Sequence, residues 1–301
     1  MTLVEANRIL DELGRKTSLS EKEEFQLTET LKFVIEKTGQ PRYAEWLGGI
    51  YYDKRMFDLA LKYYELAESL GSTWAWNGLG YIWYYGRTGT VDYEKAYYYF
   101  NKMAQSDPEE TSEYDRYEAR FKIADMYKNG YFVKKNYRRY KKIIEQLYSE
   151  ILDSEDYSYG TEVKIRLAAI REKEGETDEA IDLYLQAKDE LAYRLSYNRF
   201  FGDINRMNWL INDLYKLIDI DLTDFDLYDL FYILKEEHTV TFKHRRRKRE
   251  IESRLNDEGE TNICFDDIWY RNISDFFIKA NLGEESIEHE YDYMSDWRIK
   301  K

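Results

Sequence analysis

The feature that most constrains this chain is an internal repeat of a short helical pattern. Leu47-Gly48 recurs as Leu79-Gly80, 32 residues later, and two further copies follow at Ile123-Ala124 and Leu167-Ala168, each 44 residues on. In every copy a large apolar residue precedes a glycine or an alanine, as the close packing of two helices requires. Self-similarity at this period predicts an array of helical units in which each unit packs mainly against its neighbours.

Each copy is followed by a second helical pattern with a marker residue of its own. These markers are Ala60, Ala96, Tyr140 and Ala180. The marker follows the glycine or alanine of its copy by 12 residues in the first and fourth copies and by 16 in the second and third. The longer spacing predicts an enlarged loop in the two middle copies. Tyr140 stands where a small residue is expected, so the third copy should pack differently.

Paired helices at this period resemble tetratricopeptide repeats. The enlarged copies resemble the Sel-1-like variant, through Leu79-Gly80, Tyr84-Tyr85-Gly86 and the run from Asp92 to Ala96. The fourth copy, from Gly175 to Tyr184, is closer to an ordinary tetratricopeptide unit, and the resemblance covers about residues 42–190. It implies a right-handed α-α superhelix. Members of such families are generally adaptors that hold other proteins in a concave groove.

The regions outside the repeats predict the remaining organisation. Residues 1–40 form N-terminal capping helices, at 3–13 and 20–38, with Ser20 and Glu23 as a capping box. The repeats occupy 41–190, and a C-terminal helical cap with one helix over 197–218 occupies 191–236. The class is therefore mostly α, with a small α+β module at its C-terminal end.

The α+β module is expected at 237–301. Alternating patterns predict strands at 239–242, 250–253 and 261–265, followed by a helix over 274–280 and a last strand near 296–299. A single long helix over 245–256 is the alternative interpretation of the segment that contains the basic residues.

Composition separates the possible partners. Aromatic residues make up 17% of the chain, which favours binding surfaces, although rings that fill the seams between helices explain the same number. The formal net charge of −14 repels phosphate backbones, so nucleic acid is an unfavourable ligand and a basic protein a favourable one. The same charge also simply keeps a protein in solution.

The binding site expected from the resemblance is the groove lined by the first helix of each pair. Its predicted residues are Glu45 and Tyr52 in the first copy, Trp74, Asn77, Tyr81 and Tyr84 in the second, and Phe121, Asp125 and Lys128 in the third. Tryptophan and tyrosine are frequent interface hot spots, and an asparagine side chain is able to hold a peptide backbone. The competing interpretation is seam packing.

A basic run at 243–249 is the strongest local departure from the acidic composition. Arg245, Arg246 and Arg247 at its centre are a candidate contact patch for an acidic partner or RNA. Alternatively, the run is a hairpin tip that pairs with acidic residues of this same chain.

Residues for catalysis or metal binding are sparse. Three histidines lack the spacing of a helical zinc site, and the single cysteine, Cys264, cannot complete a tetrahedral set. Cys264 as a nucleophile would need His244 or His289 as its base, whereas a buried small apolar role is the simpler interpretation. We expect no metal and no cofactor. The first residues lack a signal peptide and no apolar run is long enough to span a membrane, which predicts a cytoplasmic protein.

These observations predict a non-catalytic scaffold that binds a peptide or helix of another protein in an aromatic, acidic groove. The alternative is an immunity-type inhibitor that masks the basic active site of a toxin nuclease. An enzyme centred on Cys264 or on acidic clusters is a third hypothesis.

Overall fold

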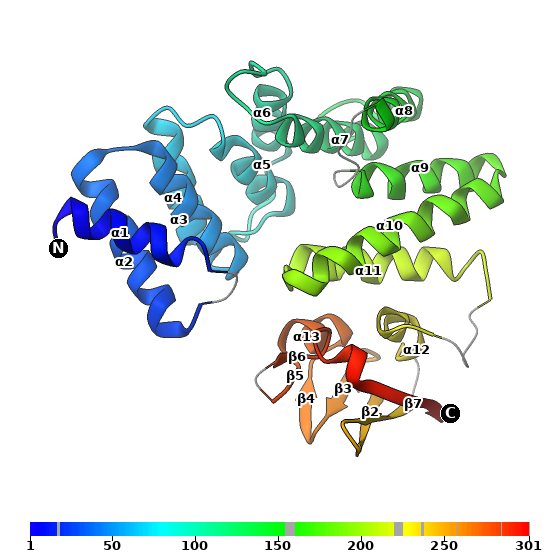
Figure 1. Ribbon diagram of the computed structural model, residues 1–301. Coiled ribbons are helices and arrows are strands. Elements are labelled where there is room, and N and C mark those ends of the chain that lie inside the picture. Colours follow the sequence, from blue (N-terminus) through cyan, green and yellow to red (C-terminus); the bar gives the residue numbers. More distant parts are fainter. Residues whose placement is uncertain are drawn as a thin grey trace. The chain divides into compact units, whose positions relative to one another are not determined.

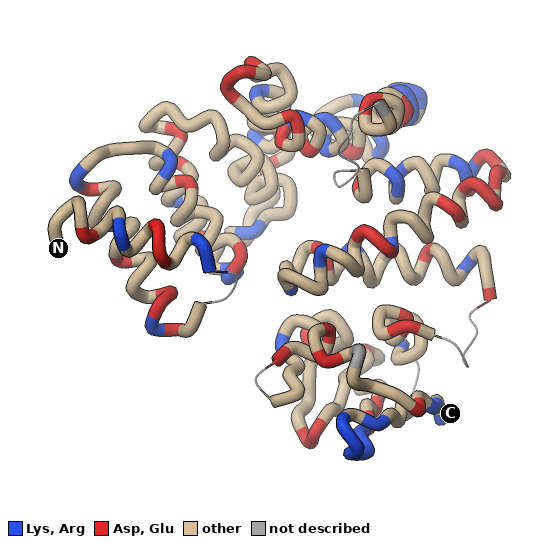
Figure 2. Tube along the Cα trace, viewed as in Figure 1, with Lys and Arg blue, Asp and Glu red and all other residues tan. Residues whose placement is uncertain are grey.

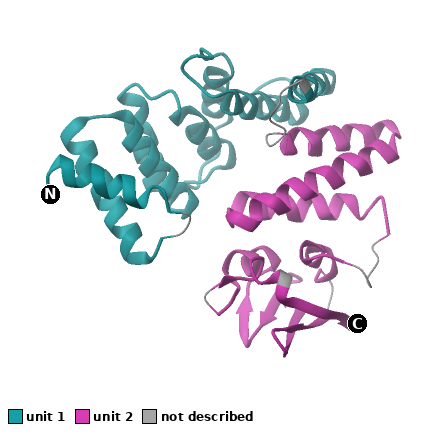
Figure 3. Cartoon of the chain, viewed as in Figure 1, with its two compact units in different colours: residues 1–154 teal, residues 155–301 magenta. Residues whose placement is uncertain are grey.

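The computed structural model describes residues 1–16, 19–153, 160–219, 225–235, 238–256, 258–283 and 285–300. The chain divides into two compact units, residues 1–154 and 155–301 (Figure 3). Helices make up the first unit, and the second combines helices with a small β-sheet (Figure 1). The division falls inside the repeat array expected for 41–190, and the boundaries expected at 40, 190 and 236 stay predictions.

The described part of the first unit is a series of α-hairpins. Its helices are α1 (Leu3–Leu13), α2 (Glu21–Thr38), α3 (Pro41–Asp53), α4 (Phe57–Ser69), α5 (Ala75–Tyr85), α6 (Tyr93–Ala104), α7 (Glu113–Asn129) and α8 (Tyr137–Asp153). Each helix packs against the next along the chain, and α3 also contacts α5, as α5 contacts α7. The first helices of three successive hairpins therefore form one layer.

Local sequence signals set these boundaries. The capping box predicted at Ser20 is present, because its side chain accepts from the Glu23 amide while Glu23 accepts from the Ser20 amide. The enlarged loops are confirmed at residues 86–92 and 130–136, against 54–56 between α3 and α4. Gly86 and Gly130 close α5 and α7 in the left-handed conformation that glycine adopts without strain.

The small residues of the repeat lie where a ring from the second helix presses against the first. A Cβ atom on Gly48 would come within 2.7 Å of the Tyr64 ring, and one on Gly80 within 2.5 Å of the Phe100 ring. The third hairpin has different residues at the equivalent positions. Tyr140 takes the position of the small residue and is 1% exposed, while the aliphatic Ile144, one turn later, is fully buried.

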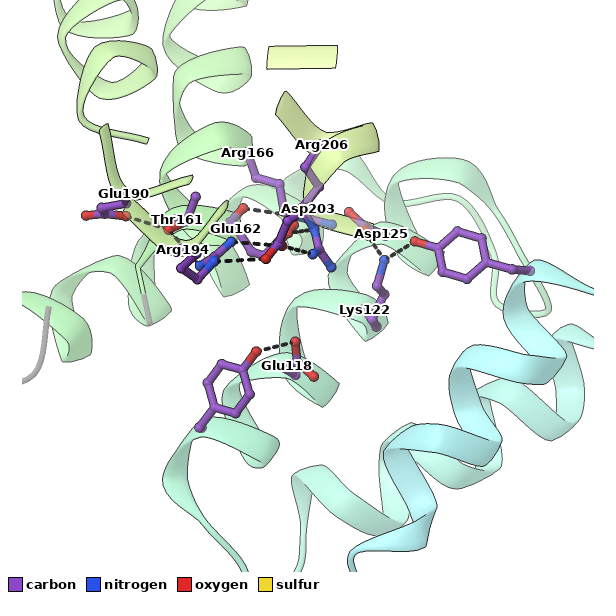
Figure 4. A network of polar contacts seen from close by, with 12 residues as sticks. Glu118, Lys122, Asp125, Thr161, Glu162, Arg166, Glu190, Arg194, Asp203 and Arg206 are labelled. Carbon is purple, nitrogen blue, oxygen red and sulfur yellow. Dashed lines mark hydrogen bonds and ion pairs between the residues drawn. The ribbon is translucent and has the colours of Figure 1, made fainter. Parts of the chain in front are cut away.

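The second unit begins with α9 (Thr161–Glu174), α10 (Thr177–Tyr197) and α11 (Phe201–Leu214). The helix expected over 197–218 is present as α11, but it starts only at Phe201, because the chain leaves helical geometry at Asn198, whose backbone is extended. Charged side chains tie the three helices together (Figure 4). This network contains Glu162, Arg166, Arg194, Asp203 and Arg206. Each of these charged side chains forms an ion pair with one of opposite charge, so we interpret the network as structural.

The C-terminal module confirms the α+β prediction. Short helices η2 (Leu227–Asp229) and α12 (Leu230–Ile233) precede a five-stranded sheet in the order β4-β3-β2-β1-β7. Its strands are β1 (Thr239–His244), β2 (Arg247–Leu255), β3 (Thr261–Phe265), β4 (Ile268–Tyr270) and β7 (Met294–Lys300). Between β4 and β7 lie α13 (Ile273–Lys279), β5 (Asn281–Leu282), β6 (Glu285–Ser286) and η3 (Tyr291–Tyr293). The alternative of one helix over 245–256 was wrong, because residues 247–255 pair with β1 and β3.

Candidate functional site

The layer of first helices in the first unit contains an open pocket of about 380 Å³. Helices α3, α5 and α7 each contribute side chains, and Tyr64 of α4 lies at its wall. On α3 the lining residues Glu45, Gly49 and Asp53 are spaced four apart, which places them on one face of the helix. The pocket is therefore built by consecutive repeats.

Aromatic rings form much of the wall. Trp46 and Tyr52 come from α3, while Trp74 and Tyr81 come from α5 and the residue that precedes it. Trp74 is 46% exposed, so a large apolar ring faces solvent at the rim. Because tryptophan is costly to leave in water and frequent at interfaces, this ring is suited to contact a partner.

Four carboxylates line the same pocket, namely Glu45, Asp53, Asp115 and Glu118. Burial raises the pKa of Glu45 to about 6; Ser72 Oγ, which donates to it at 3.1 Å, opposes the rise and Asp115 adds to it. Burial alone raises the pKa of Asp53 to about 6. Among the described residues, no lysine or arginine forms an ion pair with Glu45, Asp53 or Asp115. The pocket therefore has a negative charge that those residues do not neutralise.

Asn77 also lines this pocket, and its side-chain amide oxygen accepts no hydrogen bond from the described residues. Its Nδ2 donates to the backbone oxygen of Asp115 at 2.9 Å and to the carboxylate of the same residue at 3.1 Å. Those two acceptors fix the orientation of the amide, because the reversed orientation would face oxygen against oxygen. Asn77 is 5% exposed, and its Oδ1 has no hydrogen-bond partner in the part of the chain that the structure describes.

The neighbouring interface, between α5 and α7, is filled by a lysine of this chain. Lys122 is 3% exposed, and its Nζ donates to the Tyr85 hydroxyl at 2.7 Å and lies 3.7 Å from an Asp125 carboxylate oxygen (Figure 4). The ring centroids of Tyr84, Tyr85 and Phe121 lie 5.0, 4.9 and 5.6 Å from the same nitrogen. We call this arrangement the Lys122 cage; cation–π attraction and the ion pair stabilise it.

The predicted groove residues thus lie in two places, which share Tyr81. Lining the open pocket are Glu45, Tyr52, Trp74, Asn77 and Tyr81, and the Tyr81 ring centroid also lies 5.4 Å from Lys122 Nζ. Tyr84, Phe121 and Asp125 instead surround Lys122, and Lys128 lies 5.3 Å from the Tyr140 ring centroid, outside the pocket. Sequence reasoning missed Trp46, Asp53, Asp115 and Glu118. The spacing of four from Glu45 through Gly49 would have identified Asp53.

The predicted basic patch is the turn between β1 and β2 (Figure 2). Arg245 and Arg246 have φ angles of 45° and 74°, which a tight hairpin turn requires and glycine or asparagine usually supplies. Arg245 pairs with Glu290 of the same unit at 2.7 Å, and Arg249 pairs with Asp266 at 2.6 Å. Part of the run is therefore neutralised within the module, while Arg246 and Arg247 are exposed. The patch stays a prediction.

Cys264 lies in a setting unfavourable for a nucleophile. Burial raises the pKa of its thiol, and the carboxylates of Glu252 and Asp267 raise it further. Within the described residues no cluster of three or more His, Cys, Asp or Glu side chains is arranged to hold a metal ion. No helix in the same part of the chain has the length and apolar character needed to cross a membrane.

No protein-family model matches the chain, and no curated protein matches it. Several solved structures are similar to it, among them the following two. The crystal structure of a Sel1 repeat protein from Oxalobacter formigenes is 17% identical over 74% of this chain and 80% of that chain, with a TM-score of 0.44. A protective antigen of uropathogenic Escherichia coli strains, displaying an SLR fold, is 16% identical over 71% of this chain and 56% of that chain, with a TM-score of 0.38. Likeness at this level carries no functional argument.

Proposed function

We propose that this chain is a non-catalytic protein-interaction scaffold that binds a segment of another protein on the face formed by α3, α5 and α7. The observation that carries the proposal is the open pocket of about 380 Å³ on this face. Aromatic rings and carboxylates of the three helices line it, in place of packed apolar side chains. Rings and carboxylates that face solvent together on one surface are suited to contact another molecule.

The lining suits a protein segment in size and chemistry. Trp74 offers an exposed ring at the rim, Asn77 an unpaired amide oxygen, and Glu45 with Asp53 a negative charge. Aromatic anchors beside a few polar groups are typical of peptide-binding grooves. The inhibitor hypothesis also requires a basic partner, but it rests on charge alone.

Site-specific photocrosslinking tests the proposal in cells that express the protein. A benzophenone amino acid replaces Trp74 in one variant and Tyr98 in the other. Tyr98 is the matched control, because it is an aromatic residue on α6 with a similar exposure of 54%. We expect a defined protein to be captured from position 74 and not from position 98.

The captured partner is then purified and its affinity measured for the wild type, Trp74→Ala and Tyr98→Ala. Loss of a hot-spot ring should weaken binding by at least about tenfold for Trp74→Ala, with little change for Tyr98→Ala. Equal crosslinking from both positions, or equal affinity of both variants, would place the interaction elsewhere.

A further inference from the structure

The Lys122 cage and the open pocket occupy equivalent places in the repeat. The cage lies between α5 and α7, the pocket mainly between α3 and α5, and both helix pairs are in contact. Equivalent positions in successive repeats are defined by the Leu47-Gly48, Leu79-Gly80 and Ile123-Ala124 blocks. A residue of α5 corresponds to the residue of α3 that is 32 positions earlier, and a residue of α7 to the residue of α5 that is 44 positions earlier. Under this register Lys122 corresponds to Gly78, which has no side chain.

The groups around the ammonium correspond as well. In the cage they are Tyr81, Tyr84, Tyr85, Phe121 and Asp125. Their counterparts one repeat earlier are, in the same order, Gly49, Tyr52, Asp53, Asn77 and Tyr81. All five counterparts line the open pocket, and so does Gly78. The phenol of Tyr84 is retained as Tyr52, and the phenol of Tyr85 and the carboxylate of Asp125 change places between the two helices. The pocket thus keeps two phenols and one carboxylate of the cage, with glycine at the position of the lysine.

Charge and hydrogen bonding in the pocket agree with a missing cation. Neither Glu45 nor Asp53 forms an ion pair with a described lysine or arginine, and the pKa of each carboxyl is raised, so a positive charge nearby would stabilise both carboxylates. Independently of the acids, the buried Oδ1 of Asn77 has no donor among the described residues. An ammonium group, with three N–H donors, supplies the charge and the donor together.

We propose that this pocket binds the side-chain ammonium of a lysine on the partner protein, in the way that Lys122 is held one repeat later. The inference rests on the proposed function for its source of lysine. A flexible four-carbon stem with a compact charge is suited to an open pocket whose wall includes the rings of Trp46 and Trp74, whereas a planar guanidinium matches bidentate carboxylates better. The occupant in the neighbouring cage is a lysine of the same chemistry.

The test uses a small probe, so that it does not depend on finding the partner. Nα-acetyl-lysine N-methylamide is titrated into the full chain while the indole N–H resonance of Trp74, assigned with Trp74→Phe, is followed by NMR. We expect saturable binding with a Kd on the order of 1–10 mM. The Nε-acetylated probe, which has no charge, should bind at least about tenfold more weakly.

A double substitution checks that the pocket carboxylates are responsible. Glu45→Gln with Asp53→Asn should weaken the lysine probe by at least about fivefold. The matched control, Glu36→Gln with Glu65→Gln, removes the same charge from exposed positions of the first unit and should leave the affinity unchanged. Thermal melting of both variants confirms that each is folded before titration.

Three results would overturn the assignment: no saturable shift of Trp74, equal binding of the charged and acetylated probes, or displacement of the lysine probe by Ca²⁺ at a comparable concentration. Failure here is distinguishable from failure of the scaffold proposal. A partner that crosslinks at position 74 while the lysine probe does not bind leaves the scaffold and removes the lysine. A bound probe without any crosslinked partner keeps the ammonium site but removes the partner protein as the source of the lysine.

Discussion

Two successive interfaces of the first unit have the same architecture and opposite contents. Between α5 and α7, Lys122 is buried among tyrosines and next to Asp125. Between α3 and α5, the equivalent position is Gly78, and the space is an open pocket with carboxylates in its wall. Lys122 thus fills the space between α5 and α7, whereas between α3 and α5 the Tyr64 ring packs against Gly78 and an open pocket remains beside it.

The difference suggests different roles for the two interfaces, one that stabilises the fold and one that binds a ligand. A cage filled by its own lysine holds two helices together, because the ion pair, the hydrogen bond and the rings all act within the chain. The open pocket keeps two carboxylates, Glu45 and Asp53, with raised pKa values, so their charged forms destabilise the free protein. Such a violation of ordinary packing rules is expected at a functional site.

The largest effect is expected from emptying the filled cage. Lys122→Ala removes the ammonium from Asp125 and Tyr85 and leaves a cavity, so urea denaturation should show a loss of about 3 kcal/mol. Lys122→Met keeps most of the volume and should lose about 1–2 kcal/mol, since only the charge interactions are removed.

Added propylammonium chloride sharpens this comparison. It replaces the atoms removed in Lys122→Ala, and a ligand that binds only the folded state raises its stability. The increase in the free energy of unfolding should be larger for Lys122→Ala than for the wild type, in which only the open pocket is available to the ligand. Propanol, which has no charge, should not reproduce this increase. A Lys122→Ala variant as stable as the wild type would show that the cage contributes nothing.

A smaller loss is expected when the glycine of the open pocket receives a methyl group. A Cβ on Gly78 would come within 2.5 Å of the Tyr64 ring, which is itself buried, so Gly78→Ala should lose about 1–3 kcal/mol in chemical denaturation. The same contact explains why a lysine equivalent to Lys122 is not accommodated here.

Gly49→Ala is the matched control on the same pocket. Its nearest contact would be the Tyr64 hydroxyl at 3.8 Å, an ordinary separation, and alanine is the better helix former. We expect a gain of up to about 1 kcal/mol. If both alanine variants had the same stability, the Tyr64 ring would not be the reason for glycine at position 78.

The hairpin architecture was predictable because its signals are local. The Leu-Gly blocks identified the first helices, and the 12- and 16-residue spacings distinguished short loops from enlarged ones, as residues 54–56 and 86–92 show. The break at Asn198 was missed because apolar spacing continues across it. Only the tertiary packing of α11 shows where the new helix begins.

Some of the pocket lining was anticipated on two of its three helices. Glu45 and Tyr52 on α3, and Asn77 and Tyr81 on α5, were expected from the family resemblance and line the pocket, while their role in binding stays a prediction. On α7 the residues expected from the resemblance lie further along the helix. The pocket uses Asp115 and Glu118, near the start of that helix.

The role of Phe121 and Asp125 required knowledge of Lys122, whose destination depends on rings of another helix. No spacing within α7 encodes that α5 presents three tyrosines to it. A lysine in a helical repeat looks solvent-exposed in sequence, because long charged side chains usually are.

The smallest expected effect is the change in the free energy of unfolding when charge is removed from the open pocket. Its sign should be opposite to that for Lys122. The pKa values of Glu45 and Asp53 rise from 4.5 and 3.8 to about 6 on folding, so the folded protein binds these protons more tightly than the unfolded chain. Stability should therefore fall as pH rises from about 4 to 6, and the penalty is fully present above pH 6. Glu45→Gln with Asp53→Asn should flatten this slope and gain less than about 1 kcal/mol per site at pH 7, because solvent reaches the pocket.

Urea denaturation across this pH range, with Glu36→Gln and Glu65→Gln as control, measures the effect. Removing charge from the open pocket should stabilise the protein, whereas Lys122→Met destabilises it. Opposite signs would mean that one interface uses its charges to hold the fold and the other retains them for a ligand. If the pocket variant lost stability at pH 7 as Lys122→Met does, its carboxylates would be structural, and the contrast between the two interfaces would fail.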